Sequence, residues 1–164
     1  MRKSVTITYP ADPARVAAML ADPAYQRRRA ARLGLDDADV AVAPQGEGFT
    51  AALFGAVPPS RLPSAARRLV RSTVSFTVTE SWGEPGTDGT RTGSLEVAAT
   101  GAPVRASATG RLSPTSTGTT VTYDLDLSVS VPLVGRSIED KALSMSGRVV
   151  ADEEKRGADW LAAH

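Results

Sequence analysis

Apolar and polar residues alternate along most of this chain, and an alternation with a period of two is the signature of β-strands. The pattern is sharpest at residues 73–82, where Val74, Phe76, Val78 and Trp82 share one face and Thr and Ser residues occupy the other. The same pattern predicts further strands at residues 4–9, 40–42, 49–57, 95–97, 104–112 and 121–131. A sheet built from these strands has one apolar face and one face rich in Thr and Ser.

Two short helices are predicted directly after the first strand. Pro10 ends that strand, Asp12 is a good N-cap, and Pro13 suits the first position of a helix. A second helix starts at Pro23 and ends before Gly34, since glycine commonly terminates helices.

The longest helical pattern begins near residue 137 and continues towards residue 160. Its apolar residues recur at helical spacing and define one face: Ile138, Ala142, Met145, Val149 and Trp160. The apolar face of the sheet needs cover and no other helix is long enough, so we expect this helix to pack across the sheet. Gly147 costs about 1 kcal/mol inside a helix relative to Ala, which indicates either a close approach of the helix backbone to the sheet, the favoured interpretation, or room for a ligand.

The predicted fold class is therefore α+β, with a curved antiparallel sheet of about seven strands, two short helices after the first strand and a long C-terminal helix across the sheet. Pro58, Pro59 and Pro63 exclude a central strand and predict a connection over an opening, with about one or two turns of helix at residues 64–69. Residues 46–48 lack the glycine spacing and the following Lys of a phosphate-binding loop, and are predicted to form a hairpin turn.

Composition narrows the possible chemistry. A chain of 164 residues suits a single domain spanning residues 1–164, and 19 basic against 18 acidic residues give no overall field that would attract nucleic acid. Cysteine is absent and the one histidine is His164, so disulfides, thiolate nucleophiles and most metal sites are excluded and no metal or cofactor is predicted. The sequence has no apolar run of membrane-spanning length and no signal-peptide pattern at its start, so a cytoplasmic location without a transmembrane segment is expected.

Four short stretches stand out from the general pattern: Thr79-Glu80-Ser81-Trp82, Leu62-Pro63-Ser64-Ala65, Gly101-Ala102-Pro103-Val104 and Val131-Pro132-Leu133-Val134-Gly135. Together with the order of elements, they resemble an uncharacterised actinobacterial family within the START-like, or polyketide cyclase-like, helix-grip superfamily (SRPBCC), which also contains the plant pollen-allergen fold. The resemblance covers essentially the whole chain. It implies a hydrophobic cavity between sheet and C-terminal helix for a small apolar, lipid-like or polyketide-like molecule, and it carries over no catalytic residue.

The leading hypothesis is binding of a small hydrophobic or lipid-like molecule in this cavity, without catalysis. One alternative is an aromatase- or cyclase-like enzyme that uses Glu80, an inward arginine or Tyr123 on a polyketide-like substrate. Another is an interaction module whose cavity has collapsed. The candidate ligand-binding residues, which would equally line a plain core, are Phe49, Leu53, Phe76, Val78, Glu80, Leu95, Val97, Leu125, Leu127, Met145 and Val149.

Glu80 is the most informative of these residues, because strict alternation places its carboxylate on the apolar face between Val78 and Trp82. A buried carboxylate is costly unless it is paired. One interpretation is an acid, a base or a hydrogen-bonding anchor for a ligand. The favoured interpretation is structural: either the alternation slips at the strand end, or Glu80 pairs with an arginine such as Arg67, Arg68 or Arg148.

Arginines cluster in two places, at Arg27, Arg28, Arg29 and Arg32 on the second short helix, and at Arg67, Arg68 and Arg71 near the proline-rich connection. They could face an anionic partner or membrane headgroups near a cavity mouth. We favour solvated helix faces, since charge runs usually serve solubility.

Overall fold

The structure, a computed structural model, describes residues 1–62 and 64–164. The predicted break at Pro63 lies outside the described residues. The strands are β1 (Arg2–Tyr9), β2 (Asp39–Gln45), β3 (Gly48–Val57), β4 (Val74–Trp82), β5 (Arg91–Thr100), β6 (Val104–Pro114) and β7 (Thr119–Val129). The helices are α1 (Pro13–Leu20), α2 (Pro23–Arg32), the 3-10 turn η1 (Pro59–Arg61), α3 (Ser64–Arg67), α4 (Gly135–Ser144) and α5 (Ser146–Ala163).

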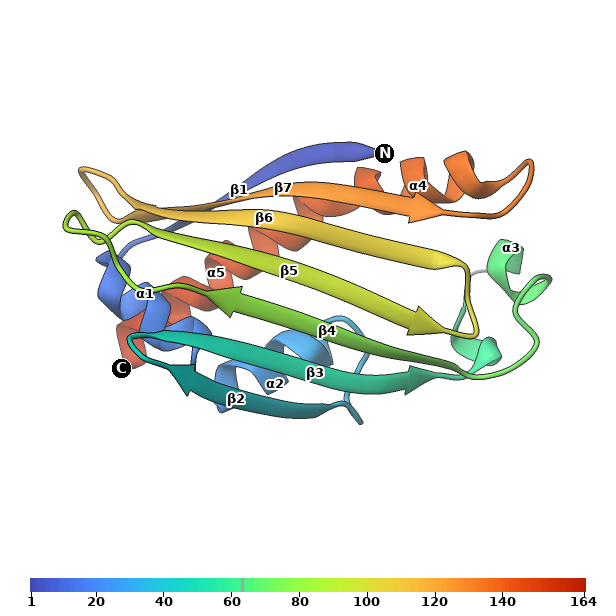
Figure 1. The fold of residues 1–164 in the computed structure, drawn as a ribbon, viewed down its shortest axis with the longest axis horizontal. Helices are drawn as coiled ribbons and strands as arrows, with labels where there is room; N and C mark the ends of the chain where they lie inside the picture. Colours follow the sequence, from blue (N-terminus) through green and yellow to red (C-terminus); the bar gives the residue numbers. More distant parts are fainter. Residues whose placement is uncertain (63) are drawn as a thin grey trace.

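All seven strands form one antiparallel sheet in the order β1-β7-β6-β5-β4-β3-β2. The sheet curves, and α1, α2, α4 and α5 lie on its concave side (Figure 1). Antiparallel partners share a face, so the pairing of Val78 with Leu53 and Val97 places the alternating apolar residues of neighbouring strands on the concave side. The predicted α+β architecture is confirmed.

Local chemistry explains the two short helices. The Asp12 carboxylate accepts a hydrogen bond from the backbone N–H of Arg15 (3.0 Å), and the Asp22 carboxylate accepts one from Ala24 (2.8 Å). Each aspartate therefore caps a helix whose first residue is a proline, which has no N–H to leave unpaired. The two predicted helices are confirmed, with the predicted N-cap at Asp12 and the predicted first positions at Pro13 and Pro23.

The predicted continuous C-terminal helix is divided at Met145 into α4 and the 18-residue α5. The hydroxyl groups of Ser144 and Ser146 donate to the carbonyl oxygens of Lys141 (2.7 Å) and Leu143 (2.8 Å). These side-chain bonds engage carbonyl groups at the end of α4 and compete with its continuation. The backbone N–H of Met145 accordingly bonds to Ala142, a tighter turn than that of an α-helix.

The face of the C-terminal helices that meets the sheet differs from the predicted one. Met145 and Val149 are 52% and 49% exposed, so the expectation that they pack against the sheet is wrong. The residues that α5 buries are Glu153, Gly157 and Leu161, at helical spacing on another side. The predicted close approach at Gly147 is also wrong, because a Cβ atom there would have no neighbour within 4 Å. The close approach occurs at Gly157, whose Cβ would overlap the ring of Tyr9.

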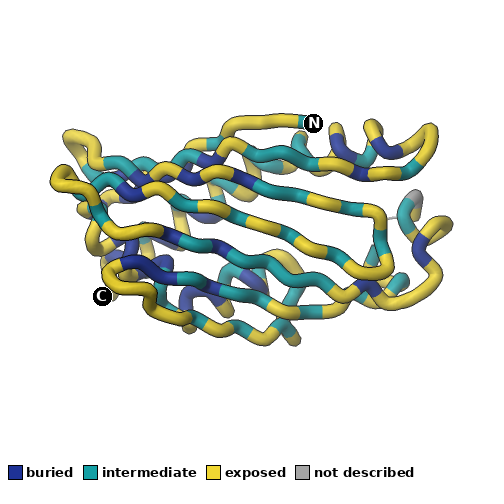
Figure 2. The backbone as a smooth tube through the Cα atoms, in the orientation of Figure 1, coloured by how far each residue is buried: buried dark blue, intermediate teal, exposed yellow. Residues whose placement is uncertain are grey.

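The hydrophobic core lies towards the end of the sheet that holds α1. Met19 and Leu20 of α1 and Leu112 and Val121 of the sheet are at most 1% exposed. Along β6, the buried positions are Ala108, Gly110 and Leu112, whereas the half of the strand nearer α3 is only partly covered (Figure 2). The concave face is therefore packed at one end and loosely covered at the other.

Candidate functional site

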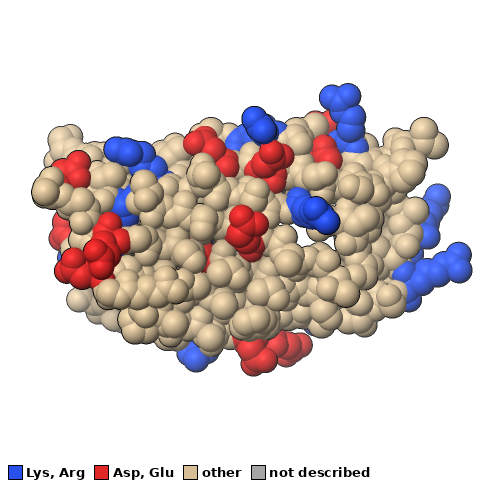
Figure 3. Space-filling view, viewed as in Figure 1, with Lys and Arg blue, Asp and Glu red and all other residues tan. Residues whose placement is uncertain are grey.

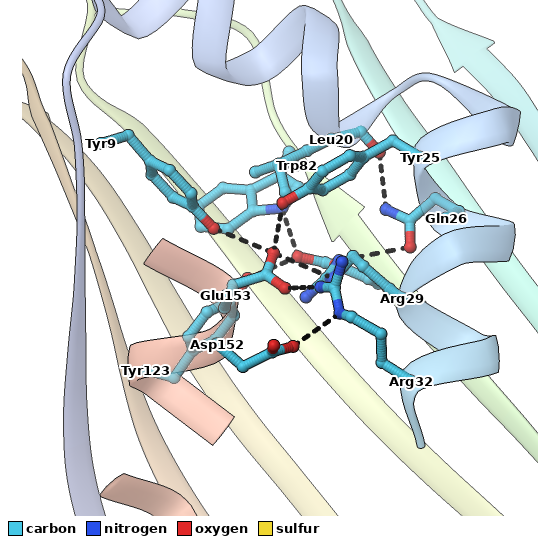
Figure 4. Close-up of polar contacts among 11 residues, drawn as sticks. Tyr9, Leu20, Tyr25, Gln26, Arg29, Arg32, Trp82, Tyr123, Asp152 and Glu153 are labelled. Carbon is cyan, nitrogen blue, oxygen red and sulfur yellow. Dashed lines mark hydrogen bonds and ion pairs between the residues drawn. The ribbon is translucent and has the colours of Figure 1, made fainter. Parts of the chain in front are cut away.

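A cluster of polar side chains lies inside the concave face, with Arg29 of α2 facing Glu153 of α5 (Figure 4). Glu80 is 4% exposed and accepts three hydrogen bonds. Arg29 of α2 donates to Oε2 (2.8 Å), and the indole N–H of Trp82 (2.9 Å) and the hydroxyl of Tyr123 (2.5 Å) donate to Oε1. Alternation along β4 thus points the carboxylate inward, where α2, β4 and β7 supply its partners.

Arg29 also reaches a second buried carboxylate, that of Glu153 on α5, with 3.3 Å between Nε and Oε1. Glu153 accepts hydrogen bonds from the hydroxyl groups of Tyr9 (3.1 Å) and Tyr25 (2.8 Å), and from Arg32 of α2. The network therefore ties α2 and α5 to each other and to the sheet. Both buried carboxylates are paired, as a low-dielectric interior requires.

The network fixes its own protonation states. Burial alone would raise the pKa of Glu80, but the Arg29 guanidinium and the hydrogen bonds from Tyr123, Trp82 and Arg29 outweigh it, and the pKa is lowered. Burial, reinforced by the nearby carboxylates, raises the pKa of Tyr9, Tyr25 and Tyr123. At neutral pH the carboxylate of Glu80 is therefore charged and the phenols of the three tyrosines are neutral.

The favoured interpretation of Glu80 as one half of an ion pair is confirmed, but its partner is Arg29 and not Arg67, Arg68 or Arg148. The reason is that α2 turns one side towards the concave face. Arg27 and Arg28 are exposed as expected, whereas Arg29 and Arg32 are directed inward and bind buried carboxylates. The interpretation of this basic run as a solvated face is therefore wrong for these two residues.

Arg67, Arg68 and Arg71, near the proline-rich connection, are exposed. In Figure 3 charged side chains of both signs lie over the outer face of the sheet, and Lys and Arg side chains gather at the end that holds α3. Both interpretations of these three arginines require this exposure, so the favoured solvated face stays a prediction.

A cavity of about 140 Å³ lies beside the network, between α2 and strands β2 to β5. Leu53, Val78, Glu80 and Leu95, all predicted as ligand-binding residues, line it. Its remaining walls come from the second helix, the segment that follows it, and β2 and β3: Gln26, Arg29, Ala30, Leu33, Leu35, Val40, Ala51 and Ala52. The structure thus brings part of the predicted set together with residues that the sequence pattern did not single out.

The other predicted site residues lie elsewhere on the concave face. Phe49 is a buried core residue, and Leu125 packs against that core. Phe76, Val97 and Leu127 are half-buried towards the α3 end and do not line the cavity. Met145 and Val149 lie on the exposed side of the C-terminal helices and do not line it either.

The contributions of α2 were missed because its arginines suggested a solvent-exposed helix. A signal was nevertheless present, since Tyr25, Arg29 and Arg32 are spaced four and three residues apart and so lie on one side of a helix. An aromatic residue on that side indicates that this side is buried. On that basis Arg29 could have been predicted to face the sheet.

Within residues 1–62 and 64–164, no group of three or more His, Asp or Glu side chains is placed to hold a metal ion. Over the same residues, no helix combines the length and apolar character needed to span a bilayer.

The model of the family described as "Protein of unknown function (DUF2505)" matches residues 4–161. The chain belongs to the DUF2505 family. No curated protein matches this DUF2505 chain.

Solved structures share the fold of this DUF2505 chain. An uncharacterised protein from Rhizobium leguminosarum superposes with a TM-score of 0.58 at 10% identity, over 97% of this chain and 94% of that one. The protein Ara h 8.0201 gives 0.53 at 10% identity, over 100% and 99%. A norcoclaurine synthase point mutant from Thalictrum flavum, in complex with a transition state analogue, gives 0.54 at 10% identity, over 100% and 95%. At these identities the similarity shows the fold, which is the predicted START-like helix-grip fold.

Proposed function

We propose that this DUF2505 protein binds a small hydrophobic molecule in the cavity beneath α2. The observation that carries the proposal is a cavity of about 140 Å³ whose walls are mostly aliphatic, in a molecule whose remaining concave face is well packed at one end. An engineered apolar cavity of about 150 Å³ stays dry and binds benzene, so a space of this size suits a compact ring or a short branched chain.

The half-buried apolar positions beyond the cavity extend the same surface. Phe76, Val97 and Leu127 lie on the concave face towards α3, where a longer, lipid-like ligand would extend from the cavity. A lipid-like ligand would therefore need this loosely covered region as well as the cavity, whereas a ring-sized ligand would need the cavity alone. Glu80 and Arg29 are the members of the polar network that line the cavity, and there they would orient a polar group of the ligand.

Binding is better supported than catalysis. A general acid or base works best when its pKa lies near the working pH. The pKa of Glu80 is lowered, mainly by Arg29 acting against burial, and that of Tyr123 is raised by burial and Glu80. Tyr123 already donates its hydroxyl proton to Glu80, and Glu80 already accepts three hydrogen bonds, so neither group is well placed to exchange a proton with a substrate.

The proposal is tested by native mass spectrometry of the purified protein, organic extraction of any bound molecule, and thermal shift with benzene, indole and a fatty acid. Ligand binding to the native state alone raises the unfolding free energy by about 2.7 kcal/mol at a hundredfold excess over Kd. Val78→Phe should fill the cavity and weaken binding at least tenfold. Thr77→Phe, the same insertion on the opposite face of β4, should leave binding unchanged.

The hypothesis fails if no molecule co-purifies and none of the three probes raises the melting temperature. It also fails if Val78→Phe and Thr77→Phe weaken binding equally, because the cavity would then not be the site. Glu80→Gln tests the polar wall: an unchanged affinity in a folded variant would exclude it as an anchor. The actinobacterial origin and cytoplasmic location expected from the sequence remain predictions.

A further inference from the structure

Arg91, at the start of β5, is a buried arginine without an acidic partner. It is 8% exposed and takes part in none of the ion pairs that the described residues form. An arginine keeps its positive charge under physiological conditions, and a buried charge is costly unless it is compensated. The other inward arginines, Arg29 and Arg32, each contact two carboxylates. Arg91 differs from them in this respect.

The hydrogen bonds of Arg91 leave one edge of its guanidinium free. Nη1 donates to the carbonyl oxygens of Glu47 (2.7 Å) and Gly83 (2.9 Å). In the described part of the chain Nη2 makes no hydrogen bond, and Nε is buried without a partner. The edge formed by Nε and Nη2 carries two parallel N–H groups, the geometry that binds both oxygens of a carboxylate, with Nε covered by protein atoms in this structure.

Arg91 lines a groove of about 480 Å³, separate from the cavity beneath α2. A volume of this size suits a small organic ligand. One wall is the small-residue side of α1 with the start of α2, and the other is the β2–β3 hairpin: Ala14, Ala17, Ala18, Ala21 and Pro23, and Val42, Pro44, Gly48 and Phe49. The groove therefore offers apolar walls beside a single uncompensated positive charge.

Glu47 is the acidic residue on this groove, and it does not compensate Arg91. Its side chain is exposed, and only its backbone carbonyl bonds to the guanidinium. Glu47 lies in the two-residue turn between β2 and β3, and this bond ties the backbone of the turn to Arg91. The hairpin therefore positions Arg91 without neutralising it.

We infer that the groove between α1 and the β2–β3 hairpin is a second binding site, which takes a small carboxylate with a compact apolar body. The carboxylate binds Nη2 of Arg91, and Nε once the groove wall adjusts, while the apolar body lies against the alanines of α1. This site is independent of the proposed ligand cavity, because the two spaces share no lining residue.

The test is titration of the ¹⁵N-labelled protein with benzoate and with benzamide, its neutral counterpart of the same shape, at constant ionic strength. Benzoate should bind at least tenfold more tightly and shift the amide resonances of residues 14–21 and 42–49. Arg91→Met should reduce benzoate affinity to that of benzamide. Glu47→Gln should tighten benzoate binding about two- to fivefold, because it removes a repulsive charge from the groove.

Ala18→Phe provides a variant that keeps Arg91 and its two backbone bonds. Ala18 is exposed on the groove side of α1, so the larger side chain blocks the groove without entering the core, and benzoate affinity should fall at least tenfold. This variant decides the question if Arg91→Met does not fold. Equal affinities for benzoate and benzamide, or unchanged benzoate affinity in Ala18→Phe, would overturn the inference. Shifts confined to Leu53, Val78 and Leu95 would assign benzoate to the other cavity and overturn it as well.

Discussion

The concave face has two halves that differ in how they are covered. In the packed half, Tyr9, Trp82, Leu112, Val121 and Tyr123 are at most 6% exposed. In the open half, five apolar residues on the concave face are only half-buried: Leu53, Phe76, Val78, Val97 and Leu127. Both halves belong to the same strands and the same face of one sheet, so the strand pattern alone does not distinguish them.

The difference comes from the helices. In the packed half, α5 approaches so closely that only glycine fits at position 157, and Glu153 joins the Arg29–Glu80 pair. At the other end of α5, a Cβ at Gly147 would meet nothing, and Val149 is half exposed. The polar network therefore holds α2 and α5 against one half of the sheet and leaves the other half loosely covered.

The largest effect is expected from breaking the network. Glu80→Gln removes one partner of a buried ion pair and should lower the free energy of unfolding by about 3 kcal/mol. Glu96→Gln is the matched control, because Glu96 is exposed on the adjacent strand, and should change the unfolding free energy by less than about 0.5 kcal/mol. Urea denaturation of both variants measures the difference.

Comparison of wild type with Glu80→Gln gives a pH dependence of stability with a defined sign. Because the folded-state pKa of Glu80 is lowered, its stabilisation is present above the ordinary value of 4.5 and is lost as the pH falls through the lowered value. Wild type and Glu80→Gln should therefore converge in stability in acid. If the difference in unfolding free energy between the two proteins stays constant from neutral pH into acid, Glu80 is not charged in the folded protein.

Two glycine substitutions on α5 compare the halves directly. Gly157→Ala places a Cβ against Tyr9, 2.6 Å from Cδ1, and overpacking of this kind should destabilise by about 2 kcal/mol. Gly147→Ala enters open space and should stabilise by about 0.5 kcal/mol through the unfolded state. Melting temperatures that change in opposite directions in the two variants support the account. A loss of stability in Gly147→Ala would mean that the helix meets the sheet there.

A smaller loss of stability is expected at high pH. The chain contains 3 tyrosines, and all of them donate to the buried carboxylates. Burial raises the pKa of each, so their stabilisation is complete below the ordinary value of 10.0 and is lost as the pH rises towards the raised values. Absorbance at the phenolate band should therefore rise only with unfolding. A tyrosine that ionises near pH 10 in the folded protein would place it outside the network.

Much of the fold could be predicted because β-strands are recognised by a period of two in the sequence, and because Asp12 and Pro13 mark a helix start. The division at Met145 could not, since Ser144 and Ser146 break the helix through local side-chain bonds and not through proline or glycine. The inward position of Glu80 was predictable from alternation along one strand. Its partner was not, because the Arg29–Glu80 pair joins residues 51 positions apart.

The buried side of α5 was mispredicted for a related reason. Hydrophobicity favours the side with Met145 and Val149, whereas the buried side carries Glu153 and Gly157. A glutamate there is stable because arginines and tyrosines meet it, and a glycine is required because a tyrosine ring lies against it. Both causes are tertiary contacts, which no local pattern contains.

The central claim is that the open half binds an apolar molecule while the packed half does not. Methyl NMR during titration with benzene tests it most directly, since leucine and valine residues report from both halves. The account predicts saturable shifts at the methyl groups of Leu53, Val78 and Leu95 and none at those of Leu112 and Val121. Shifts of equal size in both halves, or none at Leu53, Val78 and Leu95 in benzene-saturated solution, would contradict it.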